Sequence, residues 1–179
     1  YRIVARRSAG IETLADLKGK RIGTQPKSSG DYFLQVMLKT ANLTPSDIIY
    51  VPFMARTDAP VSLLPEKLHE GEIDAVALWE PQVERARRAV GDDAVVFCDP
   101  AVYTEKFCLC TTAASLADPA MRPRIIAFVR SLIDASARLR SNPEDGWPLV
   151  AEAADLDLET VCNAGPRFTY PGTLASDLL

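Results

Sequence analysis

The chain has 179 residues, of which 47% are apolar and 25% are charged, and this composition suits one globular domain or two small lobes. Its formal net charge is −4, and the basic residues are scattered apart from Arg85, Arg87 and Arg88, which we interpret as a solvated helix face. The sequence therefore lacks the clustered basic face of a nucleic-acid-binding protein, and no apolar run approaches the ~20 residues that cross a bilayer.

The first two thirds of the chain alternate between strand-like and helix-like segments. Six short runs predict strands, at Arg2–Ala5, Arg21–Thr24, Ile48–Phe53, Ala75–Trp79, Ala94–Cys98 and Phe107–Thr111. Such alternation is typical of an α/β fold with a mostly parallel sheet and crossover helices. The run at 75–79 is apolar on both faces, so we expect it to lie inside the sheet.

The helical segments follow from periodicity and from their end signals. The clearest one runs from Gly30 to about Ala41, where Phe33, Val36 and Met37 repeat at helical spacing. A short helix carries Pro65 in its first turn, and another opens at Glu80-Pro81. Beyond Thr112 no strand pattern follows, and we predict helices at about 119–141, 143–154 and 157–164, the first with one apolar stripe.

The first seven residues predict a charged strand without the apolar core and cleavage site of a secretion signal. The sequence also has no initiator Met. We therefore expect it to be part of a longer protein, whose targeting signal lies outside this sequence.

The cysteines and the one histidine predict neither a metal site nor a catalytic set. Cys108-Leu109-Cys110 lacks the two-residue spacing of zinc sites, and a disulfide from Cys98 to either cysteine stays open beside buried free thiols. His69 lies near a helix end with no nucleophile motif around it, which favours a solvated helix-terminal residue. We expect no metal, no cofactor and no enzymatic activity.

A candidate anion site lies where a strand passes through a Ser/Gly loop into the first helix. Ser28, Ser29, Gly30 and Asp31 open this helix, whose first backbone N–H groups and positive dipole end would suit a sulfonate, carboxylate, phosphate or nitrate. A plainly capped helix without a ligand explains the same residues, and both interpretations stay open.

An aromatic residue and a carboxylate follow the strand at 75–79. Trp79 and Glu80 lie at its carboxyl end, where open α/β sheets bind ligands, and Tyr32 stands at the start of the first helix. Together they would form a mixed pocket for a small molecule. The aromatic residues would equally serve as core side chains.

An ordered set of motifs carries a family resemblance. It consists of Ile11 to Thr24 (IETLADLKGKRIGT), Ser28-Ser29-Gly30, Gly71-Glu72-Ile73-Asp74-Ala75-Val76 and Trp79-Glu80-Pro81. This set resembles the periplasmic substrate-binding proteins of ABC transporters, in the branch for nitrate, sulfonate, taurine and thiamine-precursor pyrimidines. The match is good over 1–112 and loose beyond.

The resemblance implies a type II periplasmic-binding fold whose two lobes close on a ligand in the cleft between them. Residues 1–9 would be a hinge or crossover strand, 10–103 the second α/β lobe, and 104–179 the return strand and a helical, incomplete part of the first lobe. The N-terminal part of the family fold would be missing from this sequence.

The resemblance also implies a function and a site. It assigns Ser28, Ser29 and Gly30 to the anion, with Asp31, Tyr32, Trp79 and Glu80 beside it. Because Glu80 would repel a simple anion by ~1 kcal/mol or more, we expect a ligand with a cationic or hydrogen-bond-donating part.

The protein would be an extracytoplasmic solute-binding component that meets the membrane only through an ABC permease. The alternatives are a sensory ligand-binding domain of a signalling protein and a pyrimidine-precursor synthase.

Overall fold

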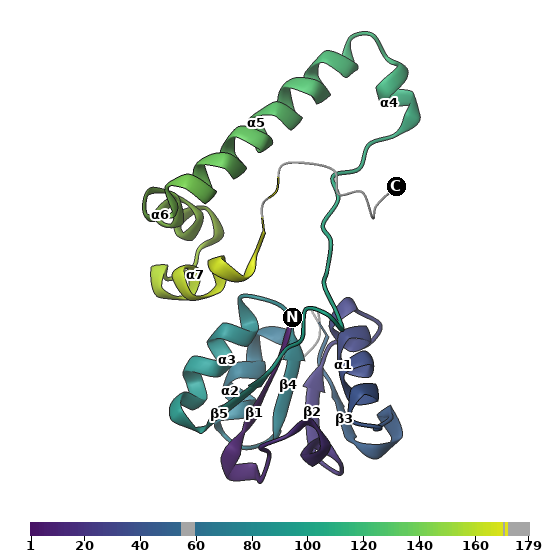
Figure 1. The fold of residues 1–179 in the computed structure, drawn as a ribbon, viewed down its shortest axis with the longest axis vertical. Helices are drawn as coiled ribbons and strands as arrows, with labels where there is room; N and C mark the ends of the chain where they lie inside the picture. Colours follow the sequence, from purple (N-terminus) through teal and green to yellow (C-terminus); the bar gives the residue numbers. More distant parts are fainter. Residues whose placement is uncertain (55–59, 170, 172–179) are drawn as a thin grey trace. The chain divides into compact units, whose positions relative to one another are not determined.

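The computed structural model describes residues 1–54, 60–169 and 171. The chain divides into two compact units, unit 1 (Tyr1–Glu105) and unit 2 (Lys106–Leu179) (Figure 1). Among the described residues, no helix combines the length and the apolar character that a membrane span requires.

Unit 1 is built on a sheet that has five strands in the described residues. Its strands are β1 (Arg2–Arg6), β2 (Arg21–Thr24), β3 (Ile49–Pro52), β4 (Ala75–Leu78) and β5 (Ala94–Phe97), in the order β3-β2-β4-β1-β5. β2 runs parallel to β3 and β4, whereas β1 runs antiparallel to β4 and β5. Four strands therefore share one direction, and β1 lies among them in the opposite direction.

Helices cover both faces of this sheet, as Figure 1 shows. α1 (Ser29–Thr40) packs on one face, where Phe33 and Leu38 meet Ile3 and Ile22 in one buried cluster. α2 (Leu64–His69) and α3 (Gln82–Val90) cover the other face, in a second buried cluster listed by its residues: Val4, Phe53, Leu64, Leu68, Ile73, Val76, Leu78, Val83 and Ala86. The α/β fold class predicted from the alternation of segments is confirmed.

Short turns connect these elements. Pro65 stands in the first turn of α2 as predicted, because its missing N–H and fixed φ cost little there. Gly71 follows that helix with a φ of +77°, a conformation that a side chain disfavours. Further 3-10 turns lie at Arg7–Ala9, Leu14–Leu17, Pro45–Asp47, Val61–Leu63 and Gly91–Asp93.

Unit 2 is helical throughout its described residues. It contains α4 (Ala113–Ala117), α5 (Met121–Ser141), α6 (Pro143–Ala154) and α7 (Leu158–Ala164), followed by a 3-10 turn at Gly165–Arg167. Two glycines allow close packing, because a Cβ at Gly146 would lie 2.4 Å from Leu139 and one at Gly165 would lie 2.7 Å from the Trp147 ring. The three helices predicted here are confirmed.

The strand predicted at Phe107–Thr111 is wrong. These residues form no regular element, and Phe107 and Leu109 are 78% and 61% exposed. Alternating apolar side chains make a strand only where a neighbouring strand accepts the backbone hydrogen bonds, and the described residues provide none there. The predicted crossover strand at the chain start does form, but as β1 inside the sheet of unit 1.

Candidate functional site

The predicted site residues gather at one edge of the sheet of unit 1. β2 and β4 both end at this edge, and β1 begins there, because Arg2 pairs with Leu78. Helix α1 starts a few residues after β2, and Trp79 and Glu80 follow β4 directly. The carboxyl ends of parallel strands are where open α/β sheets bind ligands. We call this region, formed by residues 25–32, 79–84 and the start of β1, the carboxyl edge.

Ser28 and Asp31 are engaged in closing the start of α1. The Ser28 hydroxyl accepts the Asp31 N–H at 3.2 Å and donates to the Gln25 carbonyl at 2.7 Å. The Asp31 carboxylate accepts the Lys27 N–H at 2.9 Å and a Gln35 side-chain N–H at 3.2 Å. Both side chains therefore act as caps, as the plain-helix interpretation of the sequence has it for them.

Ser29 and Gly30 leave donors in the first turn. Among the hydrogen bonds of the described residues, none uses the backbone N–H of Ser29 or Gly30. The Ser29 hydroxyl lies 2.6 Å from that of Tyr1. Gly30 is buried, and a Cβ there would lie 3.2 Å from the Trp79 ring, so glycine lets α1 approach β4 closely. The arrangement offers hydrogen bonds to an anion without a charged side chain.

Aromatic side chains surround this helix start. The Tyr1 ring lies 6.1 Å from Trp79, 5.8 Å from Phe33 and 5.3 Å from Tyr103. Tyr32, whose ring lies 5.9 Å from Tyr103, is 59% exposed. The cluster is therefore mainly core, and Tyr32 offers its ring to solvent.

The phenol groups of this cluster are neutral at pH 7. Burial raises the pKa of Tyr1, only partly offset by its hydrogen bond to Ser29. Burial and the hydrogen bond that Tyr103 donates to Glu105 raise the pKa of Tyr103 as well. Both hydroxyls are therefore available as hydrogen-bond donors.

Glu80 is held in a buried ion network. Its side chain is 6% exposed, and its Oε1 lies 2.6 Å from Nη2 and 2.9 Å from Nε of Arg2, which is itself 2% exposed. Its Oε2 accepts the Glu84 N–H at 3.2 Å. Both carboxylate oxygens are thus occupied by the protein. The structure places Glu80 as the partner of Arg2, not as the free carboxylate from which the sequence argument on the ligand's cationic part started.

Glu84 and Arg87 complete this network. Arg2 donates from Nη2 to Glu84 at 2.9 Å, and Arg87 donates to the same carboxylate at 2.7 to 3.1 Å. Burial raises the pKa of Glu84, but the hydrogen bonds from Arg87 and Arg2 outweigh it, so the pKa lies below its usual value. Two arginines and two glutamates are therefore charged together, and their formal charges cancel.

Sequence reasoning missed Arg2, Tyr1, Glu84 and Tyr103 at this edge. Glu80 and Glu84 stand four residues apart at the start of a helix, a spacing that puts them on one face. That signal could have suggested a shared cation. It does not identify Arg2, which lies 78 residues earlier in the sequence than Glu80.

The family assignment rests on the sequence model of the NMT1/THI5-like proteins, which matches residues 1–145 and thus most of the chain. The chain belongs to the NMT1/THI5-like family. It is also 26% identical over 164 residues to candidate binding proteins of Brucella abortus and Brucella suis, a match that covers 89% of this chain and 50% of each relative. The chain thus spans half the length of the curated relatives it matches.

Solved structures share the fold. The aliphatic sulphonate binding protein SsuA of Escherichia coli (TM-score 0.63, 23% identity) covers 90% of this chain, which covers 49% of it. The alkanesulfonate-binding protein SsuA of Xanthomonas axonopodis pv. citri, bound to MOPS (TM-score 0.64, 21% identity), covers 90%, against 53% of its own length. The desulfurization enzyme DszB (TM-score 0.60, 16% identity) covers 98%, against 65%. The predicted resemblance to periplasmic substrate-binding proteins is confirmed, and at these identities the structures show the fold alone.

In this member of the NMT1/THI5-like family, the Gly71–Val76 motif serves the opposite edge of the sheet. Asp74 accepts hydrogen bonds from the backbone and side chain of Arg21 at 2.7 to 3.0 Å, and Arg6 lies 3.5 Å away. Burial raises the pKa of Asp74, but the bonds from Arg21 outweigh it, so the pKa lies below its usual value. Of the motifs behind the resemblance, this one stabilises the fold, whereas Ser28–Gly30 and Trp79–Pro81 lie at the carboxyl edge.

The remaining candidates lie in other surroundings. The His69 Nδ1 lies 2.7 Å from the Ala89 carbonyl oxygen, which links the ends of α2 and α3. All four cysteines are exposed free thiols, so the expectation of buried thiols is wrong, and no disulfide from Cys98 forms. The described residues hold no group of three or more acidic, histidine or cysteine side chains that could bind a metal ion.

Unit 2 has a groove of its own. Helices α5 and α6 form a groove of about 580 Å³ lined by Ala135, Arg138, Leu139, Asn142, Asp145, Gly146, Leu149, Val150 and Ala153. None of the predicted site residues belongs to it. Its lining is mostly apolar and offers no concentration of donors for an anion.

Proposed function

We propose that this chain is the ligand-binding part of an extracytoplasmic solute-binding protein that delivers an organic sulfonate to an ABC permease. The observation that carries the proposal is the pair of uncommitted backbone N–H groups of Ser29 and Gly30 at the start of α1. Family membership and the fold shared with two sulfonate-binding SsuA proteins support it.

We assign the site residues two kinds of role. Ser29 and Gly30 would hold the anionic group through N–H and hydroxyl donors, while Trp79 and the exposed Tyr32 ring would contact the organic part. Ser28 and Asp31 would act through the helix cap, and Glu80 through its ion pair with Arg2. Because that pair is neutral, a sulfonate without a cationic group would be accepted.

A ligand panel tests the proposal. Trp147→Phe leaves Trp79 as the one tryptophan, because the chain has two. We expect ethanesulfonate, taurine or MOPS, titrated to millimolar concentration, to change Trp79 fluorescence and raise the melting temperature. Nitrate and an aminopyrimidine test the other ligand classes of the resemblance. If no sulfonate produced either signal, the proposal would be wrong.

Ser29 locates the site. Ser29→Asp places a negative charge at the proposed anion position and should abolish sulfonate binding, whereas Ser29→Ala removes only the hydroxyl and should weaken it by about tenfold or less. Ser46→Asp adds the same charge at an exposed turn before β3, at the other edge of the sheet, and is the matched control. Binding that survived Ser29→Asp would refute the assigned pocket.

We propose binding without turnover. The fold is shared with the enzyme DszB, whose structure with biphenyl-2-sulfinic acid is known, and this makes a direct test possible. The chain should release no sulfite from biphenyl-2-sulfinate. Sulfite in proportion to protein would overturn this part of the proposal.

A further inference from the structure

The ion network at the carboxyl edge is a costly arrangement for stability alone. Arg2 is 2% exposed, and its Nη1 is buried without any hydrogen-bond partner. An unpaired buried donor costs free energy, and buried ion networks can often be replaced by apolar side chains without loss of stability. The position of Arg2 therefore calls for a reason beyond folding.

The network lies directly behind the proposed anion position. Arg2 follows Tyr1, whose hydroxyl lies 2.6 Å from that of Ser29. Glu80 follows Trp79, which lies against Gly30 in the first turn of α1. A charge on either group is therefore one residue removed from a direct contact with the anion-binding turn.

Resting on the function proposed above, we propose that Arg2 is a specificity-determining residue: it cancels the charge of Glu80, so that an anion can bind at the start of α1. Two arginines and two glutamates give this network a formal charge of zero. Without Arg2 the network carries a charge of −1 at a site that must accept an anion. At a separation of ~10 Å and an effective dielectric constant of ~20, one unit charge changes anion affinity by about tenfold or more.

Four proteins separate this electrostatic role from a structural one. The wild type and the Arg2→Met/Glu80→Gln double variant both have a neutral network, Arg2→Met has a charge of −1, and Glu80→Gln has a charge of +1. Lys27 and Asp31, the charged groups closest in sequence to the turn, are the same in all four. A structural role alone would order these proteins by damage, whereas the proposed role orders them by charge.

The measurement is the dissociation constant of ethanesulfonate by calorimetry, with its neutral analogue ethanesulfonamide as the second ligand. We expect Arg2→Met to bind ethanesulfonate about tenfold more weakly, the double variant to return to within about threefold of wild type, and Glu80→Gln to bind more tightly. These differences should shrink as salt is raised, and ethanesulfonamide should not follow the charge.

A second ion pair supplies the matched control. Arg21 and Asp74 form a similar contact at the opposite edge of the sheet. Arg21→Met and Arg21→Met/Asp74→Asn should lower the melting temperature while leaving the dissociation constant of ethanesulfonate within about twofold.

The outcomes are distinct. If the wild type binds no sulfonate, the proposed function fails and this inference fails with it. If the wild type binds but the double variant is as weak as Arg2→Met, or Arg2→Met binds normally, only the inference is overturned. Should Arg2→Met not fold, Glu80→Gln must still bind ethanesulfonate about tenfold more tightly than the double variant, and equal affinities would overturn the inference.

Discussion

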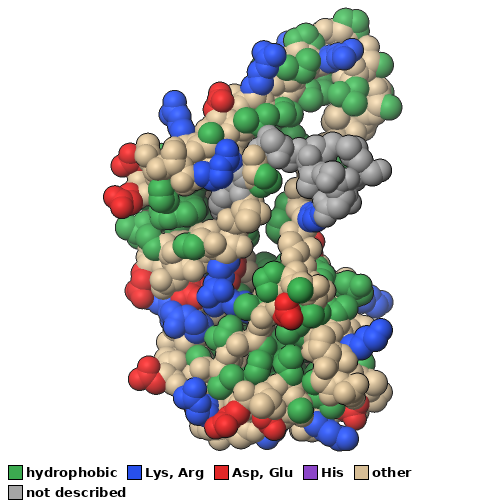
Figure 2. All heavy atoms as spheres, in the orientation of Figure 1, with side chains coloured by type: hydrophobic (Ala, Val, Ile, Leu, Met, Phe, Trp, Pro, Cys, Tyr) green, Lys and Arg blue, Asp and Glu red, His purple; other side chains and the backbone are tan. Residues whose placement is uncertain are grey.

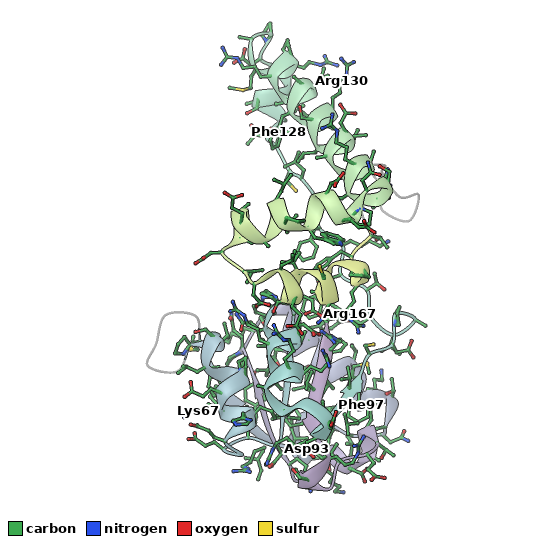
Figure 3. All side chains as sticks on the ribbon, turned by 90° about the vertical axis from the view of Figure 1, so that its left-hand side faces the viewer. Lys67, Asp93, Phe97, Phe128, Arg130 and Arg167 are labelled. Atoms are coloured by element: carbon green, nitrogen blue, oxygen red, sulfur yellow. The ribbon has the colours of Figure 1, made fainter. Side chains whose placement is uncertain are left out.

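Unit 1 and unit 2 have helices of similar apolar periodicity, but the described residues cover these faces to very different extents. In unit 1, α1 to α3 bury their apolar faces on the sheet, and Phe33 and Leu64 are at most 1% exposed. In unit 2, α5 has no buried residue, and Phe128 and Leu132 are 53% and 42% exposed. Figure 2 shows hydrophobic side chains over the surface of the α5–α7 region, and Figure 3 shows Phe128 and Arg130 on different sides of α5.

This difference separates two things that an apolar stripe is often taken to mean. The stripe shows that a helix is amphipathic and hence where its apolar face lies. It does not show that the same chain covers that face. Unit 1 meets both conditions, whereas unit 2 buries only small parts of its apolar surface, through residues such as Ala151, Val161 and Ala164.

Separating the units should give the largest effect. We expect residues 1–105 alone to unfold cooperatively in urea, because two buried clusters remain intact in them. Residues 106–179 alone should show helical circular dichroism without a cooperative transition and should bind the dye ANS. A sharp urea transition in the second fragment would show that its helices are better covered than the described residues indicate.

Matched truncations in the two units sharpen the comparison. Leu64→Ala in α2 removes a side chain that is 0% exposed and should cost about 2–5 kcal/mol of unfolding free energy. Leu132→Ala in α5 should cost less than about 1 kcal/mol, because Leu132 is 42% exposed. Urea unfolding of the whole chain, followed through Trp79 in a Trp147→Phe background, measures the first, and circular dichroism measures the second. Equal costs would contradict the comparison.

Local pattern was enough to predict most elements but not how they pair. The helices at Ser29–Thr40, Met121–Ser141 and Pro143–Ala154 follow from spacing and end signals within the segments themselves. The antiparallel insertion of β1 between β4 and β5 joins residues more than seventy positions apart, and no local signal encodes it. The segment at 107–111 failed for the same reason, since its pattern fits a strand but its pairing depends on distant chain.

The candidate site shows the same limit at the level of side chains. Sequence position alone brought Ser28–Gly30 and Trp79–Glu80 to one edge, because the carboxyl ends of parallel strands meet there. It could not show that Ser28 is engaged as a cap or that Glu80 is paired with Arg2, because each depends on side-chain contacts. The inferred ligand chemistry therefore changed from a zwitterion to an organic anion.

Acid should expose a further difference between the units. The pKa of Asp74 is lower in the folded protein than its usual value of ~3.9, so its contribution to stability is fully present above pH ~4 and is lost as the pH falls through the folded value. Asp74→Asn should cost about 2–3 kcal/mol at pH 7, with a difference from wild type that shrinks below pH 4. The control, Asp134→Asn on α5, should change stability by less than about 0.5 kcal/mol. A constant difference for Asp74→Asn down to pH 2, measured by urea unfolding, would contradict this assignment.

The two N-caps provide the smallest and most local test. Ser28 accepts the Asp31 N–H at the start of α1, and Thr112 accepts the Ser115 N–H at 3.1 Å at the start of α4. Losing either hydroxyl removes one hydrogen bond of the same kind. Ser28→Ala should nevertheless cost about 1 kcal/mol of global stability, because α1 is packed on the sheet and cannot fray without exposing its core face.

Thr112→Ala should cost less than about 0.3 kcal/mol, because α4 has no buried residues and its opening exposes little apolar surface. Hydrogen exchange adds a local view of both caps. Ser28→Ala should speed exchange of the first-turn amides of α1 only through partial opening of unit 1, whereas Thr112→Ala should speed exchange in α4 alone. Equal global costs would mean that unit 2 couples its helix ends to its packing as tightly as unit 1 does.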